Sequence, residues 1–164
     1  MSDERLLEPD EFSEVVRNHL GLLKELRPKQ IVGLIAFIGD ILSYEANKTH
    51  PSSYQYHSAA QKLVGELESF YANRPALRDE VISLSIWHES VFVRLQAVHH
   101  LLSIAADGQI ALAETYAKKL LIDEDEGVRI DARPTIVDNL DEFIEYGASE
   151  QFVAFVRDLP DPQH

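Results

Sequence analysis

The residues with the clearest chemical potential form a dense run of carboxylates near the C-terminus. Between residues 123 and 145 the chain carries nine acidic side chains and two arginines. The acidic run consists of Asp123, Glu124, Asp125, Glu126, Asp131, Asp138, Asp141, Glu142 and Glu145. Carboxylates at this density either cap and solvate helices or attract a cationic partner. We predict that the acidic run is a partner-binding surface, with solvated helix faces as the alternative.

The other metal-binding and acid–base residue types lack a matching pattern. The acidic run has no EF-hand spacing, so it does not predict a calcium site. His99 and His100 are adjacent, so on a helix they point about 100° apart and cannot share a ligand face. His88-Glu89 begins a metalloprotease-like string, but Phe92 stands where the second histidine is needed. There are no cysteines, and we therefore predict no metal site and no cofactor.

Nucleophiles and phosphate-binding loops are likewise without a sequence signature. No serine lies in a G-x-S-x-G elbow, and the seven glycines are scattered. Gly33 and Gly39 lie inside a predicted buried helix, where they are expected to allow close helix packing and not to bind a nucleotide. We predict no catalytic residues and a non-enzymatic protein.

The charge balance narrows the class of partner. Lys and Arg number 15 against 28 Asp and Glu, a formal net charge of −13. Nucleic acids and anionic lipid surfaces attract basic proteins, so direct binding to either is disfavoured. A basic protein partner is favoured because complementary potentials speed encounter. The oligomeric state is left open.

The expected location follows from two short segments. The N-terminal Met-Ser-Asp-Glu-Arg is polar and unlike a secretory signal. The most apolar stretch, Ile31–Leu42, is 12 residues long and contains Asp40, which is too short for a bilayer span. We expect a cytoplasmic protein in which this stretch is a central, buried helix, apolar almost all round.

The elements that position these residues are predicted to be helices throughout. Apolar residues recur at helical spacing, and period-2 strand patterns are almost absent. Helices are expected over Asp10–Leu26, Lys29–Asn47 and Tyr54–Ala72, with a fourth beginning at Pro75. Gly108 is expected to end a helix in left-handed geometry, and Gly147 to separate the last two helices.

The C-terminal half repeats itself at a spacing of 35 residues. Val93, Arg94 and Ala97 fall on Val128, Arg129 and Ala132. In the following helix, Leu120-Leu121 falls on Phe155-Val156, and Asp123 on Asp158. Self-similarity at such a period indicates stacked structural repeats.

The pattern Val-Arg-x-x-Ala, followed by paired apolar positions and a second helix, resembles the HEAT repeat family over about residues 76–158. The resemblance implies an all-α, right-handed stack of antiparallel helix pairs, a HEAT-like α-solenoid of about 7–8 helices. It also implies that Arg94 and Arg129 tie neighbouring repeats together through an acid such as Asp123, Asp125 or Asp158. We predict one domain over residues 1–164, in which residues 10–72 are a helical cap or degenerate repeats.

These features together predict a binding protein. A small, acidic, cysteine-free helical protein is similar in class to bacterial immunity proteins, which bind and neutralise a basic, often nuclease, toxin by covering its active site. A scaffold or assembly subunit is one alternative. A HEAT-like DNA glycosylase is another, disfavoured because it needs a basic groove. Exposed aromatic residues can anchor such a partner, and the candidates are Tyr44, Tyr54, Tyr56, Tyr71 and Tyr116.

Overall fold

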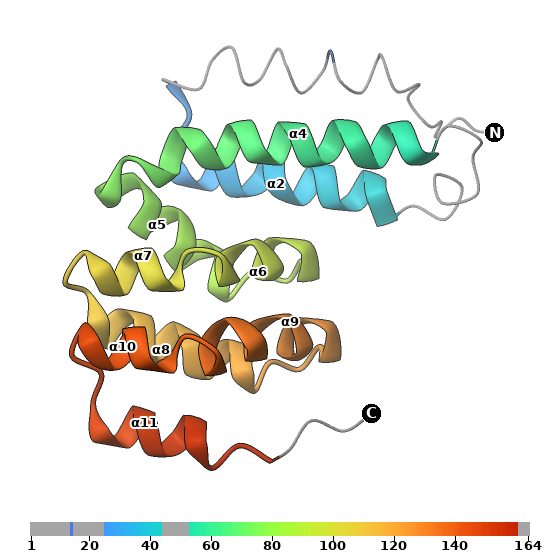
Figure 1. Cartoon of the computed structure of the whole chain (residues 1–164). Coiled ribbons are helices and arrows are strands. Elements are labelled where there is room, and N and C mark those ends of the chain that lie inside the picture. The colour runs from blue at the N-terminus through green and yellow to red at the C-terminus, as the bar shows by residue number, and fades with distance from the viewer. Residues whose placement is uncertain (1–13, 15–24, 44–52, 161–164) are drawn as a thin grey trace. The chain divides into compact units, whose positions relative to one another are not determined.

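A computed structural model describes residue 14, residues 25–43 and residues 53–160 of the chain. In these ranges the protein forms nine helices and no strand (Figure 1). The helices are α2 (Pro28–Ser43), α4 (Ser53–Ala72), α5 (Pro75–Ile86), α6 (Val91–Val98), α7 (Leu101–Ala106), α8 (Ile110–Leu121), α9 (Glu126–Val137), α10 (Leu140–Glu145) and α11 (Glu150–Arg157). The all-α prediction is confirmed for this part of the chain. The expected helix Asp10–Leu26 falls almost wholly outside it.

The chain divides into two compact units, residues 1–84 and residues 85–164. The division falls in the last turn of α5. Each unit has its own set of fully buried apolar side chains. The predicted single domain stays a prediction.

Among the described residues, no helix has the length and apolar character needed to cross a membrane.

In the first unit, α2 packs against α4 (Figure 1). Pro28 occupies the first turn of α2, where the missing N–H of proline costs nothing. Ile31, Ile35 and Ile38 are completely or almost completely buried. The opposite side of α2 is exposed, because 37% of Phe37 is accessible and an added side chain at Gly33 would meet nothing within 4 Å. The prediction of a helix buried almost all round was therefore wrong. Of the two glycines expected to allow close packing, Gly33 is exposed and Gly39 is buried.

The first helices of the two C-terminal copies begin in the same way. The Ser90 hydroxyl accepts a hydrogen bond from the Val93 N–H at 3.4 Å, and the Asp125 carboxylate accepts one from the Val128 N–H at 3.1 Å. Such N-caps satisfy an amide that has no partner inside the helix. Val93 and Val128 are both fully buried. The 35-residue spacing thus places equivalent caps and equivalent core residues.

The first helix of each C-terminal copy is broken into two shorter helices, α6 and α7 in one copy and α9 and α10 in the other. The break between α6 and α7 lies at His99 and His100, and that between α9 and α10 lies at residues 138–139. At the first break, the N–H groups of His99 and His100 bond to carbonyls three residues back, which tightens the turn. The sequence predicts 7–8 helices, and the described residues form nine. The number is higher because each of the two broken helices appears as two separate helices.

Both interrupted helices end at a glycine, as expected for Gly108. Gly108 and Gly147 have φ values of 87° and 98°, a conformation that favours glycine. The N–H of Gly108 bonds to Ala105, and that of the next residue bonds back to Ile104. Gly147 and its successor make the same two bonds in the second copy. This is the Schellman arrangement, in which the last helical carbonyls find donors.

The second copy is one helical turn longer than the first. The interval from cap to glycine is four residues longer in Asp125–Gly147 than in Ser90–Gly108. The buried residues of α11, Phe152 and Val156, therefore correspond to buried alanines of α8 at a spacing of 39 residues. The structure thus differs from the predicted match of Leu120-Leu121 with Phe155-Val156, because α9 has four more residues than α6.

Candidate functional site

Asp123 lies at the centre of a buried hydrogen-bond cluster in the loop between α8 and α9. Its carboxylate receives two bonds from Arg94, Nε to Oδ2 at 2.9 Å and Nη2 to Oδ1 at 3.1 Å. Lys119 donates to Oδ2 at 2.8 Å, and the Asp125 N–H donates to Oδ1 at 2.9 Å. Only 2% of Asp123 is exposed. The cluster joins α6, α8 and the start of α9, so Asp123 has a structural role.

The electrostatics of Asp123 follow from these contacts. Burial alone would raise the pKa of its carboxyl group. The hydrogen bonds from Lys119, from the Asp125 backbone and from Arg94 outweigh burial and hold the pKa below its ordinary value of 3.8. Asp123 is therefore a carboxylate at neutral pH, with its lone pairs already occupied by protein donors.

Arg94 and Arg129 make equivalent backbone contacts in the two copies. Arg94 Nη1 donates to the carbonyl of His88 at 2.8 Å, and Arg129 Nη1 donates to the carbonyl of Asp123 at 2.5 Å. Each arginine thus reaches the residue six positions before it. Arg94 additionally binds the Asp123 carboxylate, across to the next copy. The expected bond to one of the named acids is found for Arg94, which binds the Asp123 carboxylate. The contact of Arg129 is instead with the backbone carbonyl of Asp123, just before its own helix.

The remaining acids of the acidic run lie at or near the surface. Asp125 is half-buried and engaged in capping α9. The other seven are exposed, and we refer to them as the acidic face. The acidic face consists of Glu124, Glu126, Asp131, Asp138, Asp141, Glu142 and Glu145. Asp123 must be removed from the predicted partner-binding set because it is buried, and Asp125 has its main contact within its own helix.

Exposed apolar side chains accompany the acidic face, and sequence reasoning missed them. Ile130, Val137 and Ile144 are 63%, 38% and 39% exposed, and they stand seven residues apart. We call these three residues the outer stripe. Seven residues are about two helical turns, so Ile130 and Val137 share one side of α9, and Ile144 continues the spacing on α10 after the break at residues 138–139. Their regular spacing is visible in the sequence, but spacing alone does not distinguish an exposed apolar residue from a buried one.

The aromatic anchors suggested by the sequence need correction. Tyr71 and Tyr116 are buried, at 0% and 6% exposure. Burial raises the pKa of the Tyr71 phenol well above its usual range. The side chains of Tyr44, Tyr54 and Tyr56 lie outside what the structure describes. Among the described residues, the exposed aromatic side chains are instead Trp87, at 66%, Tyr146, at 40%, and Phe37, at 37%.

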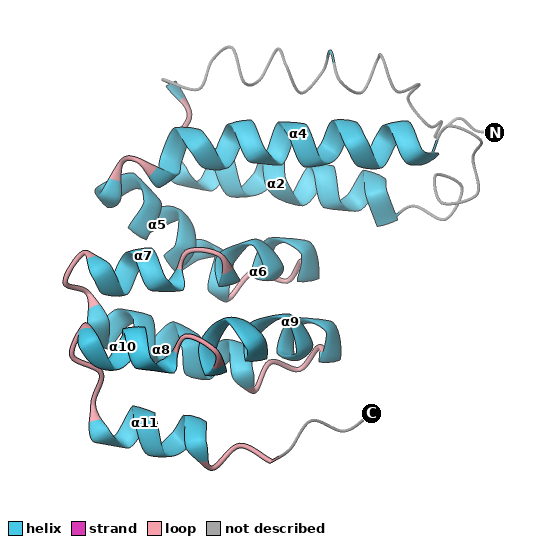
Figure 2. Ribbon diagram, in the orientation of Figure 1, coloured by secondary structure: helices cyan, strands magenta, loops and turns pink. Residues whose placement is uncertain are grey.

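Trp87 lies beside the Asp123 cluster. The Nζ atom of Lys119 is 5.4 Å from the centroid of the Trp87 ring, within the range of a cation–π contact. Ile122 stands 35 residues after Trp87 and is 67% exposed. The loop that precedes α6 and the loop that precedes α9 lie at the same end of the second unit (Figure 2). This end of the unit therefore presents an apolar residue from each copy.

The histidines that the structure describes show no arrangement for metal binding. In the described part of the chain, no three His, Asp or Glu side chains are grouped closely enough to hold a metal ion. The His88 Nδ1 atom accepts a hydrogen bond from the Ser90 N–H at 3.0 Å, next to the cap of α6. His50 lies outside the described residues. His99 and His100 lie in the break between α6 and α7.

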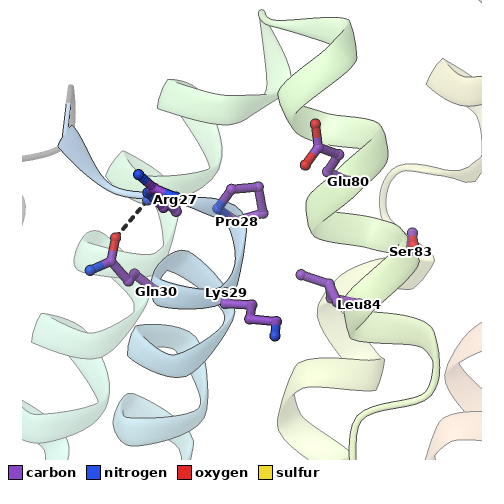
Figure 3. Close-up of a pocket in the computed structure, with 7 residues that line it drawn as sticks. All are labelled: Arg27, Pro28, Lys29, Gln30, Glu80, Ser83 and Leu84. Carbon is purple, nitrogen blue, oxygen red and sulfur yellow. Dashed lines mark hydrogen bonds between the residues drawn. The ribbon is translucent and has the colours of Figure 1, made fainter.

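A hollow of about 640 Å³ opens in the first unit. It is lined by Arg27, Pro28, Lys29, Gln30, Glu80, Ser83 and Leu84. Figure 3 shows residues at the start of α2 on one side and residues of α5 on the other. The one hydrogen bond drawn among these residues lies within the α2 side of the hollow. It runs from the Arg27 N–H to Gln30 Oε1 at 2.7 Å. The charged lining residues Arg27, Lys29 and Glu80 are all exposed, so the hollow has no buried polar group around which a ligand site is built.

Comparison of the chain with protein families, with curated proteins and with solved structures found no match.

Proposed function

We propose that this protein is a non-enzymatic binding module whose acidic face binds a basic protein. The observation that carries the proposal is the exposure of seven carboxylates on one short stretch of chain, residues 124–145. Between residues 126 and 145 there are six acids and two arginines. Both arginines donate to backbone carbonyls, Arg129 to Asp123 and Arg133 to Pro160. Neither contact is with a carboxylate of the acidic face, and six acids against two arginines leave a formal charge of −4 over residues 126–145.

Within this proposal, the partner is a bacterial toxin with a basic, nucleic-acid-binding active site, and the protein acts as its immunity protein. Carboxylates on the acidic face would occupy the positions of substrate phosphates and block entry to the active site. Charge complementarity of this kind raises the association rate and rejects wrong partners.

The proposed architecture is a HEAT-like, right-handed stack of helix pairs in the second unit. Equivalent N-caps at Ser90 and Asp125 support it, and so do the matching arginine contacts and the two glycine helix ends. A stack of repeats buries each helix pair against its neighbours and leaves one face free for binding.

The test is a comparison of two charge-reversal variants. The first changes Asp138, Asp141 and Glu142 to lysine, all on the acidic face. The control changes Glu25, Asp40 and Glu66 to lysine, which are exposed residues of the first unit. Both variants carry the same net charge. A protein captured from the native host by the wild type and by the control, but lost from the first variant, is the expected partner.

The immunity function has a separate readout. Expression of the captured partner alone should stop growth of the host, and co-expression of the wild-type chain should restore it. The variant with lysine at Asp138, Asp141 and Glu142 should restore growth less well than the control. Equal capture and equal rescue by both variants would contradict a role for the acidic face.

A further inference from the structure

The segment α9–α10 is apolar on two sides. Val128, Ala132 and Ile136 are fully buried and form the side that faces the core of the second unit. Ile130 is two residues from both Val128 and Ala132, which is about 200° around a helix. The outer stripe therefore lies roughly opposite the core side. Pro134, which is exposed, lies between its first two members.

Packing within the second unit does not cover the outer stripe. Helix α9 packs against α6, α8 and α11, and Figure 1 shows α10 following α9 across the unit at the same level. Ile130 nevertheless keeps 63% of its surface in solvent. Single exposed apolar residues are ordinary. Ile130 and Val137 stand two turns apart on α9, and Ile144 continues the same spacing on α10 beyond the break at residues 138–139. Apolar residues at such spacing are the pattern by which a helix receives another helix.

The charges beside the stripe indicate what can cover it. Asp131, Asp138 and Glu145 each directly follow a residue of the stripe, so each lies about 100° further around, on the same flank. Glu142, two residues before Ile144, lies on nearly the opposite side of α10. All three flanking acids are exposed. A second copy of this chain would bring the same carboxylates opposite one another, which is repulsive. A helix with Lys or Arg beside its apolar row would gain apolar contact and charge pairing together.

We propose that the outer stripe and this acidic flank form a docking site for an amphipathic helix of a basic partner protein. The inference rests on the proposed function and narrows it. Charge alone would allow any cationic surface to bind, whereas the stripe requires an apolar row with basic residues along one side. The acidic flank then sets the orientation of the helix, and the stripe discriminates it from merely cationic segments.

The probe is a synthetic peptide of about 18 residues, long enough as a helix to span the stripe. Its leucines lie on one helical face, its lysines along the flank of that face, and glutamines elsewhere. The control peptide has the same composition in scrambled order, so that no apolar face forms. Fluorescence anisotropy of each labelled peptide is measured against the full chain at low and moderate salt. The amphipathic peptide should bind at least about tenfold more tightly than the scrambled one.

The matched variants separate the stripe from general surface apolarity. Ile130→Ser combined with Ile144→Ser should reduce the binding of the amphipathic peptide about tenfold or more and leave scrambled-peptide binding unchanged. Ile122→Ser is the control, because Ile122 is as exposed as Ile130 but lies in the loop before α9. Both variants change surface residues, and an unchanged circular dichroism spectrum verifies their fold.

Three results would overturn the docking site. These are equal affinity for both peptides, an equal loss in Ile122→Ser, and a dimer in light scattering that the Ile130/Ile144 variant dissociates. The last result would assign the stripe to self-association. If only the lysine variant of Asp138, Asp141 and Glu142 loses the captured partner, the proposed function stands and the docking site fails. If the peptide preference holds while charge reversal leaves capture unchanged, the docking site stands and the proposed function fails.

Discussion

At the scale of single residues, position relative to the core decides what a carboxylate does. Asp123 and Glu124 are neighbours in the sequence, yet Asp123 is buried whereas 90% of the Glu124 side chain is exposed. Both belong to one acidic run and carry the same charge, so the sequence does not show which of the two carboxylates is buried. The difference arises because Asp123 follows the last turn of α8 and meets Arg94 from α6. A contact between residues 29 positions apart is a property of the fold.

Replacing Asp123 by Asn should lower the free energy of unfolding by roughly 3–5 kcal/mol, because the Arg94 guanidinium would stay buried without its main counter-charge. Urea unfolding followed by circular dichroism measures this loss. Asp158→Asn is the control, since Asp158 is the residue predicted to correspond to Asp123 but is exposed. It should change stability by less than about 0.5 kcal/mol. Similar losses in the two variants would refute the buried role of Asp123.

The ion pair between Asp123 and Arg94 also predicts how stability depends on pH. The pKa of Asp123 is lowered on folding, so the unfolded chain binds this proton first as the pH falls. The stability contributed by the carboxylate is fully present above the ordinary pKa of 3.8 and is lost below it. The stability difference between the wild type and Asp123→Asn should therefore shrink as the pH falls below that value. A constant difference down to the acid transition would contradict this linkage.

At the scale of elements, most of the described fold was predictable because its signals are local. Helical periodicity and Pro28 placed α2, and glycine chemistry placed the ends of α7 and α10 at Gly108 and Gly147. The breaks inside the interrupted helices were not predicted, because their apolar periodicity continues across them. The extra turn in the second copy was also missed. A shift of four residues keeps the same side of a helix buried, so the periodicity of the sequence does not reveal it.

The N-caps offer a test at this scale. Asp125→Ala should destabilise the protein by about 1 kcal/mol, because the Val128 N–H loses its acceptor at the start of α9. Asp125→Ser should retain most of the stability, since serine caps helices well. Thermal or urea unfolding measures both. The control is Asp131→Ala on the exposed side of α9, where alanine favours the helix, and a comparable loss there would argue against capping.

At the scale of the whole molecule, the net charge of −13 is a stronger basis than the helical fold for proposing a class of partner. An all-helical fold can serve unrelated functions, so the fold alone does not assign one. The proposal of a basic partner comes from the charge balance of the sequence, and the structure adds which carboxylates are exposed. The outer stripe required both sequence and structure, because the sequence alone does not show that Ile130 is exposed.

Duplex DNA should not be retained by this protein. In a mobility-shift assay at about 50 mM salt, where phosphate contacts are strongest, we expect no retarded band. The physical reason is that a chain of net charge −13 repels the phosphate backbone. A DNA-binding domain of known basic charge provides the positive control. Retardation by the wild-type chain would revive the glycosylase alternative.

The extra turn of α9 has a consequence for how the length of this chain can change. Adding or removing four residues between the cap of α9 and Gly147 rotates the following residues by only about 40°, so Phe143 can still reach the core. A change of two residues rotates them by about 200° and would turn Phe143 outward and Glu145 inward. Length variation in this segment is therefore tolerated in whole helical turns. The two copies, which differ by one turn, are a natural instance of that rule.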